Sequence, residues 1–257
     1  EHPEARVVGS TLTTASHPDL RALGVEPRTV QELSATVPRE VFPYVVFSAP
    51  PRAGSPQEYL EAVAGALAHW SRPTGAGPPG DVDDGAFVFT SSGGVLEEDG
   101  GGVVDESSPV AGRSPLVEAE EVVRGAGGTA LRLAGLYDVD RGAHAYWLRV
   151  GAMKTNPAKL INLVHYDDGA SAVVSALDRG AGVRGELFLV SDGSPMTPTA
   201  IVGAALEAPP YRGLDPPALE PGGGRGLGKV FDVRRTRKAL SWTPRYPSFS
   251  HFMRLQR

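Results

Sequence analysis

Short apolar runs, many of them rich in β-branched residues, alternate along the chain with segments that carry helix-start signals. Tyr44–Phe47 and Phe87–Phe89 are apolar without alternation, as expected for strands that are covered on both faces. This order of elements predicts an α/β fold with a mainly parallel sheet. The expected strands are Arg6–Leu12, Tyr44–Ala49, Ala86–Ser91, Thr129–Leu136, Leu160–His165 and Glu186–Ser191.

Helices are expected between these strands. Ser55 and Ser114 each stand before a proline, which is the arrangement of an N-cap followed by proline at the first helical position. The expected helices are Pro56–Trp70, Pro115–Arg124, Asp167–Leu177, Thr197–Leu206, Arg234–Leu240 and Phe249–Leu255. Three stretches rich in glycine, proline or acidic residues are predicted to be loops: Ser71–Asp84, Leu96–Arg113 and Ala208–Arg225.

The amino-acid composition limits the kinds of partner that this protein is expected to bind. The chain has 25 Lys and Arg against 30 Asp and Glu, a net charge of −5, which argues against a general nucleic-acid or anionic-membrane binder. There is no cysteine, so disulfides, cysteine-based metal sites and thiol catalysis are excluded. No apolar run is long enough to span a bilayer. We expect a small-molecule substrate or none as the partner, with no metal site, and with a homodimer or larger assembly left open.

Five segments, in order, resemble motifs of the extended short-chain dehydrogenase/reductase superfamily, in its NAD-dependent epimerase/dehydratase group. They are Phe87–Ser92, Leu131–Tyr137, Asn162–Asp168, Leu187–Gly193 and Leu240–Pro244, and together they extend over most of the chain. Pro50-Pro51 and Asp140–His144 are similar to a branch of NAD(P)-binding Rossmann proteins from plants, algae and bacteria. The resemblance implies a Rossmann-like doubly wound parallel sheet with a small C-terminal α/β lobe. It implies a cofactor domain over residues 1–158, an intermixed C-terminal region over 159–257, and a plastid location.

The family begins with a strand, a G-x-x-G-x-x-G turn and a helix, and nothing of this kind stands near Glu1. Arg6–Leu12 resembles the family's second strand, so the first βα unit is missing. Either the chain is a truncated version of a longer protein or the unit was lost and the sheet rearranged. We expect Arg6–Leu12 to share a sheet with Tyr44–Ala49. Without the glycine turn, whose N–H groups hold the pyrophosphate, we expect weak cofactor binding by these residues alone.

One further glycine motif does not replace that turn. Gly223–Lys229 fits the spacing G-x-x-x-x-G-K, but Val230 stands where a serine or threonine would hold Mg²⁺. We expect a loop rather than a phosphate-binding site.

In the family a serine and a Tyr-x-x-x-Lys pair carry the chemistry. The resemblance assigns Ser92 as the catalytic serine. If Glu120 aligns with the glutamate that follows the pair, Gly112 replaces the tyrosine and Leu116 replaces the lysine. Neither can carry a proton, so the usual relay is absent. Two functions stay open: an oxidoreductase or epimerase acting on a small polar substrate through an atypical site, and a non-catalytic structural or regulatory scaffold.

The resemblance also implies positions for the ligands. Thr13 and Thr14 end the second strand without an acidic residue, and their hydroxyls favour NADP over NAD. The other residues expected at the cofactor are Ser48, Ala49, Pro50 and Ser91. The residues expected at the substrate are Arg113, Tyr137, His144 and His165.

For two of these groups a purely structural role is the alternative. His165 and Tyr166 would then cap and pack the strand end, with Asp167 or Asp168 as the cap of the next helix. Ser91 and Ser92 would then satisfy backbone groups at a polar strand end.

Overall fold

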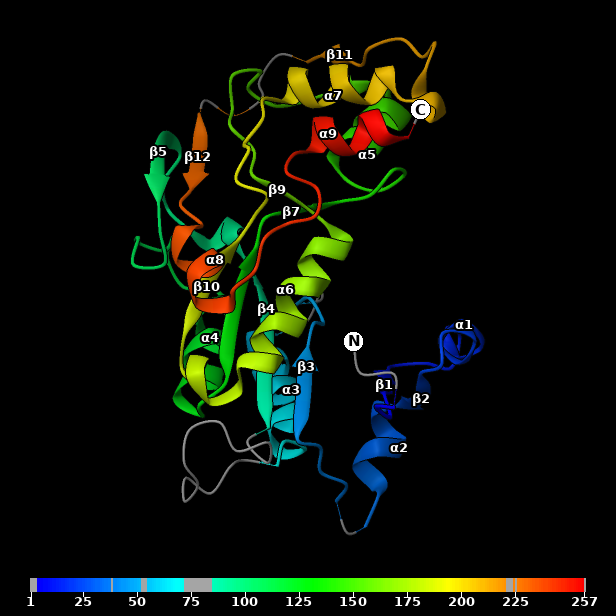
Figure 1. The fold of residues 1–257 in the computed structure, drawn as a ribbon, viewed down its shortest axis with the longest axis vertical. Helices are drawn as coiled ribbons and strands as arrows, with labels where there is room; N and C mark the ends of the chain where they lie inside the picture. Colours follow the sequence, from blue (N-terminus) through cyan, green and yellow to red (C-terminus); the bar gives the residue numbers. More distant parts are fainter. Residues whose placement is uncertain are drawn as a thin grey trace. The chain divides into compact units, whose positions relative to one another are not determined.

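The structure is a computed structural model that describes residues 4–37, 39–51, 55–71, 85–220, 224 and 226–256. The chain forms two compact units, residues 1–42 and 43–257. Figure 1 labels the elements of both. The predicted boundary after residue 158 stays a prediction.

The smaller unit is a β-α-β-α segment. Strand β1 (Val8–Thr11) pairs in parallel with β2 (Glu26–Thr29), with α1 (His17–Ala22) between them and α2 (Val30–Ala35) after them. Thr29 begins α2 with a reciprocal capping box, in which its side chain accepts from the N–H of Glu32 and the Glu32 carboxylate accepts from the N–H of Thr29. The sequence predicted β1, but not β2, because residues 26–29 contain no apolar run.

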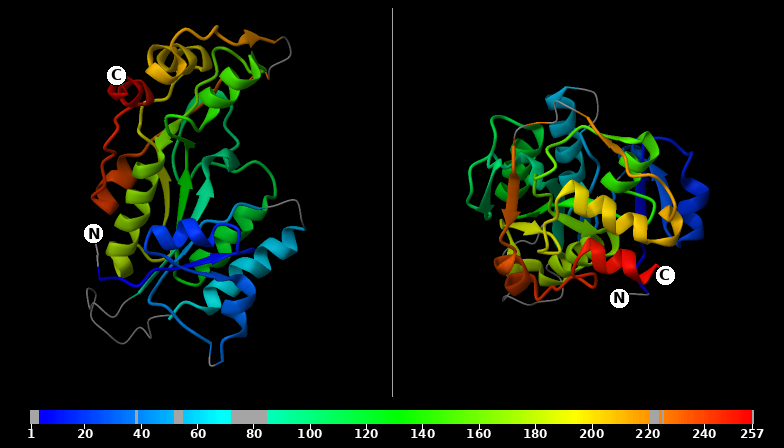
Figure 2. Two further views of the ribbon diagram at one scale, coloured as in Figure 1. Left: turned by 90° about the vertical axis from the view of Figure 1, so that its right-hand side faces the viewer. Right: turned by 90° about the horizontal axis from the view of Figure 1, so that it is seen from above.

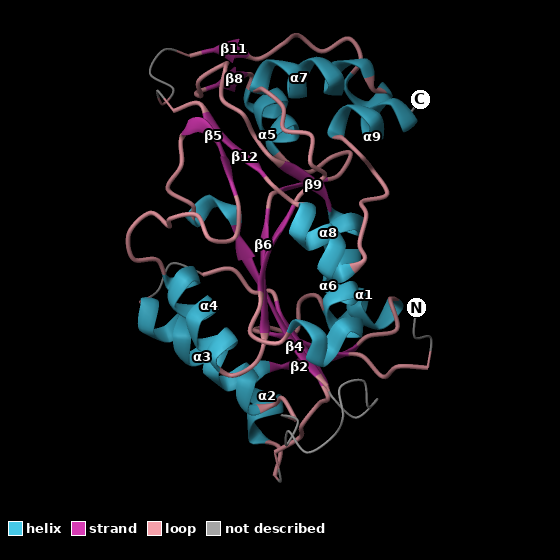
Figure 3. Cartoon of the chain, turned by 60° about the vertical axis from the view of Figure 1, so that its left-hand side comes forward, coloured by secondary structure: helices cyan, strands magenta, loops and turns pink. Residues whose placement is uncertain are grey.

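The larger unit is built on a four-stranded parallel sheet with the order β10-β6-β4-β3. Its strands are β3 (Tyr44–Phe47), β4 (Ala86–Ser92), β6 (Thr129–Leu133) and β10 (Leu187–Val190). Helices α3 (Pro56–Ala68) and α4 (Pro115–Gly125) cover one face, and α6 (Tyr166–Arg179) covers the other (Figure 3). The α/β fold class predicted from the sequence is confirmed.

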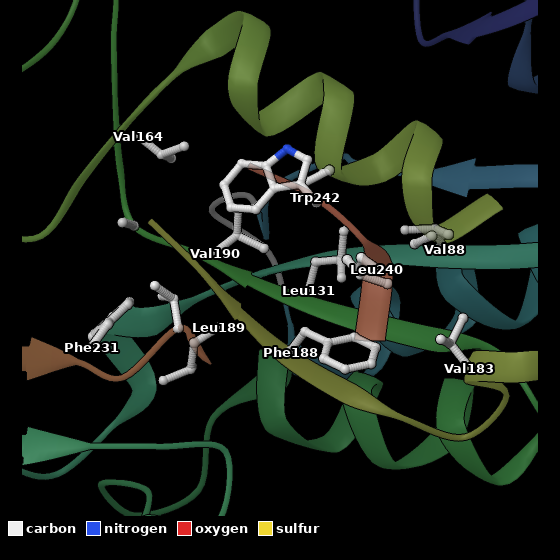
Figure 4. Packing of buried hydrophobic residues seen from close by; sticks show 14 of the residues in the cluster. Val88, Leu131, Val164, Val183, Phe188, Leu189, Val190, Phe231, Leu240 and Trp242 are labelled. Atoms are coloured by element: carbon white, nitrogen blue, oxygen red, sulfur yellow. The ribbon is translucent and has the colours of Figure 1, made fainter. Parts of the chain in front are cut away.

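Alternate residues of β4 enter the cores on opposite faces of this sheet. Phe87 and Phe89 pack with α3 and α4, whereas Val88 packs in the core beneath α6. Figure 4 shows the second core, where Val88 and Leu131 from the sheet lie with Leu240 and Trp242 from the C-terminal part of the chain. Both faces of the inner strands are buried, which explains why their sequences lack alternation. The same expectation for Tyr44–Phe47 is wrong, because β3 is an edge strand and its Tyr44 and Val46 are 49% and 42% exposed.

The expected single sheet for Arg6–Leu12 and Tyr44–Ala49 is wrong. Within the described residues β1 pairs only with β2, and β3 is the edge of the four-stranded sheet. In a doubly wound sheet the second and fourth strands of the family both neighbour the first strand rather than each other. In the described residues no hydrogen-bond ladder joins β1 to β3.

The strand predicted over Thr129–Leu136 is divided at Ala134. The N–H of Ala134 still bonds Val190 in the main sheet, whereas the N–H of Gly135 bonds the carbonyl of Asn162. From there β7 (Gly135–Tyr137) pairs with β9 (Leu163–His165), outside the main sheet. The chain thus leaves the sheet by exchanging one parallel partner for another.

Beyond this exchange lies the C-terminal lobe. Helices α5 (Ala143–Val150), α7 (Pro198–Glu207) and α9 (Phe249–Leu255) gather at one end of this unit, past the carboxyl ends of the strands (Figures 1 and 2). They enclose a third core that includes Tyr137, Leu163, Ile201, Phe249 and Phe252. Helix α8 (Arg234–Leu240) precedes α9 and, like α9, has the bounds that the sequence predicted.

Two of the expected loops contain strands. Strand β5 (Gly100–Val104) pairs with β12 (Gly228–Phe231), and β11 (Ala218–Leu219) pairs with β8 (Ala152–Met153). These short strands have partners far along the chain, so their own residues give little signal. Residues 72–84 of the third expected loop lie outside the described residues.

Gly228, the last glycine of the G-x-x-x-x-G-K spacing, begins β12, so this part of the spacing forms a strand instead of the start of a helix. Gly223 and Arg225 lie outside the described residues. Gly228 has φ +74°, and a Cβ atom there would lie 2.1 Å from the carbonyl oxygen of Leu160. Only glycine fits such a backbone without displacement.

We therefore expect Gly228→Ala to lower the free energy of unfolding by roughly 2 kcal/mol or more, through strain and the clash with Leu160. The matched control is Gly65→Ala in the middle of α3, where a Cβ meets nothing within 4 Å and alanine favours the helix. Urea denaturation of both variants measures the difference. Equal stability of the two variants would contradict the role of the close approach.

Candidate functional site

Ser92 ends β4, an inner strand of the sheet, and its side chain is exposed. Its hydroxyl oxygen accepts a hydrogen bond of 3.1 Å from the N–H of Gly94, at the start of the 3₁₀ turn Gly93–Val95. Gly93 lies against the ring of Phe231, where an added Cβ would be 2.1 Å from the nearest ring carbon. The turn after Ser92 is therefore anchored on β12, and the serine is presented at the carboxyl end of the sheet.

A buried ion pair holds the end of β4. Glu120 of α4 accepts from the hydroxyl of Ser91 at 2.5 Å, and from Arg132 of β6 through Nε at 2.9 Å and Nη2 at 2.6 Å. Both ionic side chains are about 95% buried or more. A bidentate pair of this kind is strong and directional. The Ser91 hydroxyl is therefore buried and bound to a side chain of α4, and its contact with the cofactor stays a prediction.

The positions assigned to the tyrosine and lysine lie on different kinds of backbone. Gly112 precedes α4, with φ +61°, in a left-handed conformation. Leu116 lies inside α4, which begins at Pro115 after the N-cap Ser114, and it packs against the core under α3 and α4. The two positions therefore do not lie one helical turn apart, as a Tyr-x-x-x-Lys pair on a helix would.

Three of the residues expected at the substrate are buried in the C-terminal lobe. The side chains of Tyr137, His144 and His165 are 1%, 1% and 3% exposed. The rings of Tyr137 and His165 lie 5.3 Å apart, and those of His144 and Tyr211 lie 5.5 Å apart. Burial lowers the pKa of His144, whose Nε2 lies 3.0 Å from the carbonyl oxygen of Val139. The structure thus places all three side chains in a packed interior.

The cap of α6 is His165, because its Nδ1 accepts from the N–H of Asp167 at 3.1 Å. The expectation that Asp167 or Asp168 provides this cap is wrong. Asp168 instead accepts from the backbone N–H groups of Arg245 at 2.6 Å and Tyr246 at 3.0 Å. The side chain of Asp168 points to the C-terminal segment because its own helix already has a cap.

The remaining predicted residues are exposed and come from both units. Thr13 and Thr14 follow β1 in the smaller unit. In the larger unit, Ser48–Pro50 follow β3, and Arg113 precedes α4. The carbonyl of Ala49 accepts from the hydroxyl of Tyr59 at 3.0 Å, which ties this turn to α3. Their roles at a ligand stay predictions.

Asp192 is a buried acid that the sequence did not single out. It is 2% exposed, and burial, together with the nearby charge of Asp168, raises its pKa to about 7. The only local signal is an acidic residue directly after an apolar strand and before Gly193, which is also the pattern of an ordinary turn.

The described residues contain no group of three or more His, Asp or Glu side chains that could hold a metal ion. They also contain no helix long and apolar enough to cross a membrane.

No family model matches the sequence, and no curated protein matches it. Solved structures do match. A conserved protein of unknown function from Silicibacter pomeroyi superposes with a TM-score of 0.74 at 19% identity, over 98% of this chain and 89% of that one. A dTDP-glucose 4,6-dehydratase from Bacillus anthracis in complex with NAD gives 0.73 at 12% identity, over 98% and 87%. A UDP-glucuronic acid 4-epimerase from Bacillus cereus in complex with UDP-glucuronic acid and NAD gives 0.69 at 13% identity, over 98% and 89%.

This chain has the fold of the NAD-dependent epimerases and dehydratases. The resemblance found in the sequence is confirmed at the level of the fold. At such low sequence identities the structural similarity shows the fold only, so the activity has to be argued from the site.

The buried pair makes a specific prediction for stability. Glu120→Gln leaves the Arg132 guanidinium buried without a counter-charge, and we expect a loss of about 3–5 kcal/mol in the free energy of unfolding. The matched control is Glu121→Gln, the next residue on α4, which is exposed and should change stability by less than about 0.5 kcal/mol. Chemical denaturation measures both. A similar small loss for the two variants would mean that the pair does not hold the end of β4.

Proposed function

We propose that this protein binds a nicotinamide nucleotide and a small polar, sugar-like substrate, as an NAD(P)-binding protein of the epimerase/dehydratase type. The observation that carries the proposal is the exposed Ser92 hydroxyl at the carboxyl end of an inner parallel strand. Ligands of open α/β sheets bind at this end of the strands. Solved structures of the same fold contain NAD, and one of them contains UDP-glucuronic acid as well.

In this proposal Ser92 contacts the substrate oxygen, and Arg113 orients a phosphate or carboxylate. Ser48, Ala49 and Pro50 line the cofactor, since their small, exposed side chains allow close approach. Thr13 and Thr14 favour NADP, because a hydroxyl accommodates the 2′-phosphate better than a carboxylate does. A plastid location is part of the proposal and rests on the plant-like resemblance.

A second candidate is a non-catalytic scaffold that keeps the fold and its ligand site. The residues at positions 112 and 116 favour this candidate. Gly112 and Leu116 lack titratable groups, and their backbones do not share a helical turn. Within this candidate Ser92 still contacts a ligand, but no proton relay follows.

Binding is tested by thermal unfolding with NADPH, NADH and UDP-glucose. A ligand at about 100 times its Kd adds about 2.7 kcal/mol, which for a chain of this size raises the melting temperature by roughly 5–10 °C. We expect Ser92→Ala to weaken substrate binding by roughly 3- to 10-fold, the equivalent of one hydrogen bond. Ser175→Ala in the middle of α6 is the matched control. Because these residues lack the glycine turn, little or no shift is expected with NADPH and NADH; the absence of a shift with UDP-glucose would overturn the proposal.

Turnover separates the two candidates. If the scaffold is correct, neither the natural chain nor Gly112→Tyr/Leu116→Lys converts a nucleotide sugar, because position 112 lies outside α4. Chromatographic analysis of the nucleotide sugar measures this, since an epimerase or dehydratase returns the hydride to the sugar and leaves the nicotinamide absorbance unchanged. Turnover by the natural chain would favour the enzyme with an atypical proton donor. Turnover gained by the double variant alone would contradict the backbone argument.

A further inference from the structure

Two buried carboxyl groups hold one short segment of the chain. Asp168 of α6 and Asp192, which follows β10, are each 2% exposed. Asp168 accepts from the N–H groups of Arg245 and Tyr246. The carboxyl of Asp192 accepts from the N–H of Ser194, whose hydroxyl in turn donates to the carbonyl of Pro247 at 2.8 Å. Arg245–Phe249 is the segment that leads into α9. The position of α9 therefore depends on both carboxyl groups.

The two carboxyl groups are not equivalent. Both oxygens of Asp168 accept backbone hydrogen bonds at 2.6 and 3.0 Å. In Asp192, Oδ1 accepts from the N–H of Ser194 at 2.8 Å, whereas Oδ2 is buried without a partner of hydrogen-bonding geometry. A buried oxygen of this kind is costly as part of an anion and much less costly as part of a neutral acid.

The charged and titratable groups around Asp192 come from several elements. Asp168 of α6 repels its negative charge, and Arg237 of α8 attracts it, with Nη2 bonded to the backbone oxygen of Asp192 at 2.8 Å. Tyr137 of β7 is close enough that Asp192 and Asp168 both raise the pKa of its hydroxyl, as does Tyr246. The ring of Tyr137 lies 5.3 Å from that of His165 of β9.

None of these groups gives Asp192 a direct ion pair. The Arg237 guanidinium is bound to a backbone carbonyl. Nδ1 of His165 accepts from the N–H of Asp167, and its Nε2 lies 3.5 Å from Oδ1 of Asp138, so this ring faces other carboxylates than that of Asp192. The hydroxyl of Tyr137 is buried without a partner. Burial raises the pKa of Asp192 to about 7, as expected for a buried carboxyl group without a direct ion pair.

We propose that Asp168 and Asp192 form a proton-dependent latch on α9: a proton on Asp192 keeps Arg245–Phe249 closed on the lobe, and loss of that proton to solvent releases α9. In the open form the Asp192 carboxylate is hydrated and no longer faces Asp168. Because the closed form binds the proton more tightly, closure weakens as the pH rises from about 4 to about 7 and changes little above that. The latch does not depend on nucleotide binding.

Helix α9 covers the three side chains that the resemblance assigns to the substrate. The ring of Phe249 lies 5.0 Å from that of Tyr137 and 4.9 Å from that of His144, and the ring of Phe252 lies 4.4 Å from that of His165. The three covered side chains are those that the resemblance assigns to the substrate. Release of α9 exposes them to solvent, so the latch controls access to this part of the lobe.

Amide hydrogen exchange tests the latch in the full chain. After correction for the intrinsic effect of pH, we expect the amides of residues 248–253 to open about tenfold more at pH 8 than at pH 6. Amides of β4 and β6 in the same sample report global unfolding and should stay protected. Unchanged protection of residues 248–253 between the two pH values would overturn the proposal.

The variant Asp192→Asn removes the titrating group and keeps the shape of the side chain, and it should abolish the pH dependence of exchange at α9. Asp215→Asn, at an exposed loop position, is the matched control and should keep the full tenfold change. A tenfold change that persists in Asp192→Asn would overturn the proposal. If that variant does not fold, ¹³C NMR titration of Asp192 in the natural chain decides: a midpoint near neutrality supports the latch, and an ordinary midpoint near 4 overturns it.

Discussion

The arrangement of the candidate site depends on one buried carboxylate. Glu120 joins the end of β4, through Ser91, to β6, through Arg132, and it does so from α4 on the face of the sheet. Removing such a charge from water is compensated only when its hydrogen bonds are nearly complete. Three elements are therefore fixed relative to one another at the point where Ser92 is presented. The serine can be exposed and still be well positioned, because its neighbour is held so firmly.

A second constraint builds the lobe that faces this strand end. At Ala134 and Gly135 the chain exchanges the carbonyl of Val190 for that of Asn162 as its partner. The strand thereby passes out of the main sheet without leaving backbone groups unpaired, which would be costly in the interior. The result is a short parallel pair, β7 and β9, that carries Tyr137 and His165 side by side into the third core.

This protein keeps the fold of the NAD-dependent epimerases and dehydratases, but two positions of its candidate site lack a titratable side chain. The sheet, the serine at the strand end and the C-terminal lobe follow the fold of the NAD-dependent epimerases and dehydratases, whereas positions 112 and 116 carry no proton relay. Titratable groups are instead found inside the lobe, where Asp168 and Asp192 hold the approach to α9. The proton-dependent step that we propose therefore lies in the lobe and not at the exposed serine.

Several features were determined by the sequence alone. The unbroken apolar run of β4 indicated a strand covered on both faces, and the serine before a proline at Ser55 and Ser114 indicated two helix starts, so these elements were predictable from local residues. The same holds for α8 and α9, and the order of the five motifs indicated the fold. The run of β3 indicated a strand but not its place at the edge of the sheet, where Tyr44 and Val46 are exposed. Ser92 followed from its place at the end of one of these strands.

Only the tertiary structure decided the rest, because the deciding partners are far apart in the chain. The glycine-rich β5 is a strand because β12 lies beside it. His165 is a helix cap, which leaves Asp168 free to bind a segment nearly eighty residues later. Asp192 looks like any acidic turn residue until burial and a second carboxyl group surround it. Local sequence records propensity, whereas desolvation and pairing depend on what the fold brings into contact.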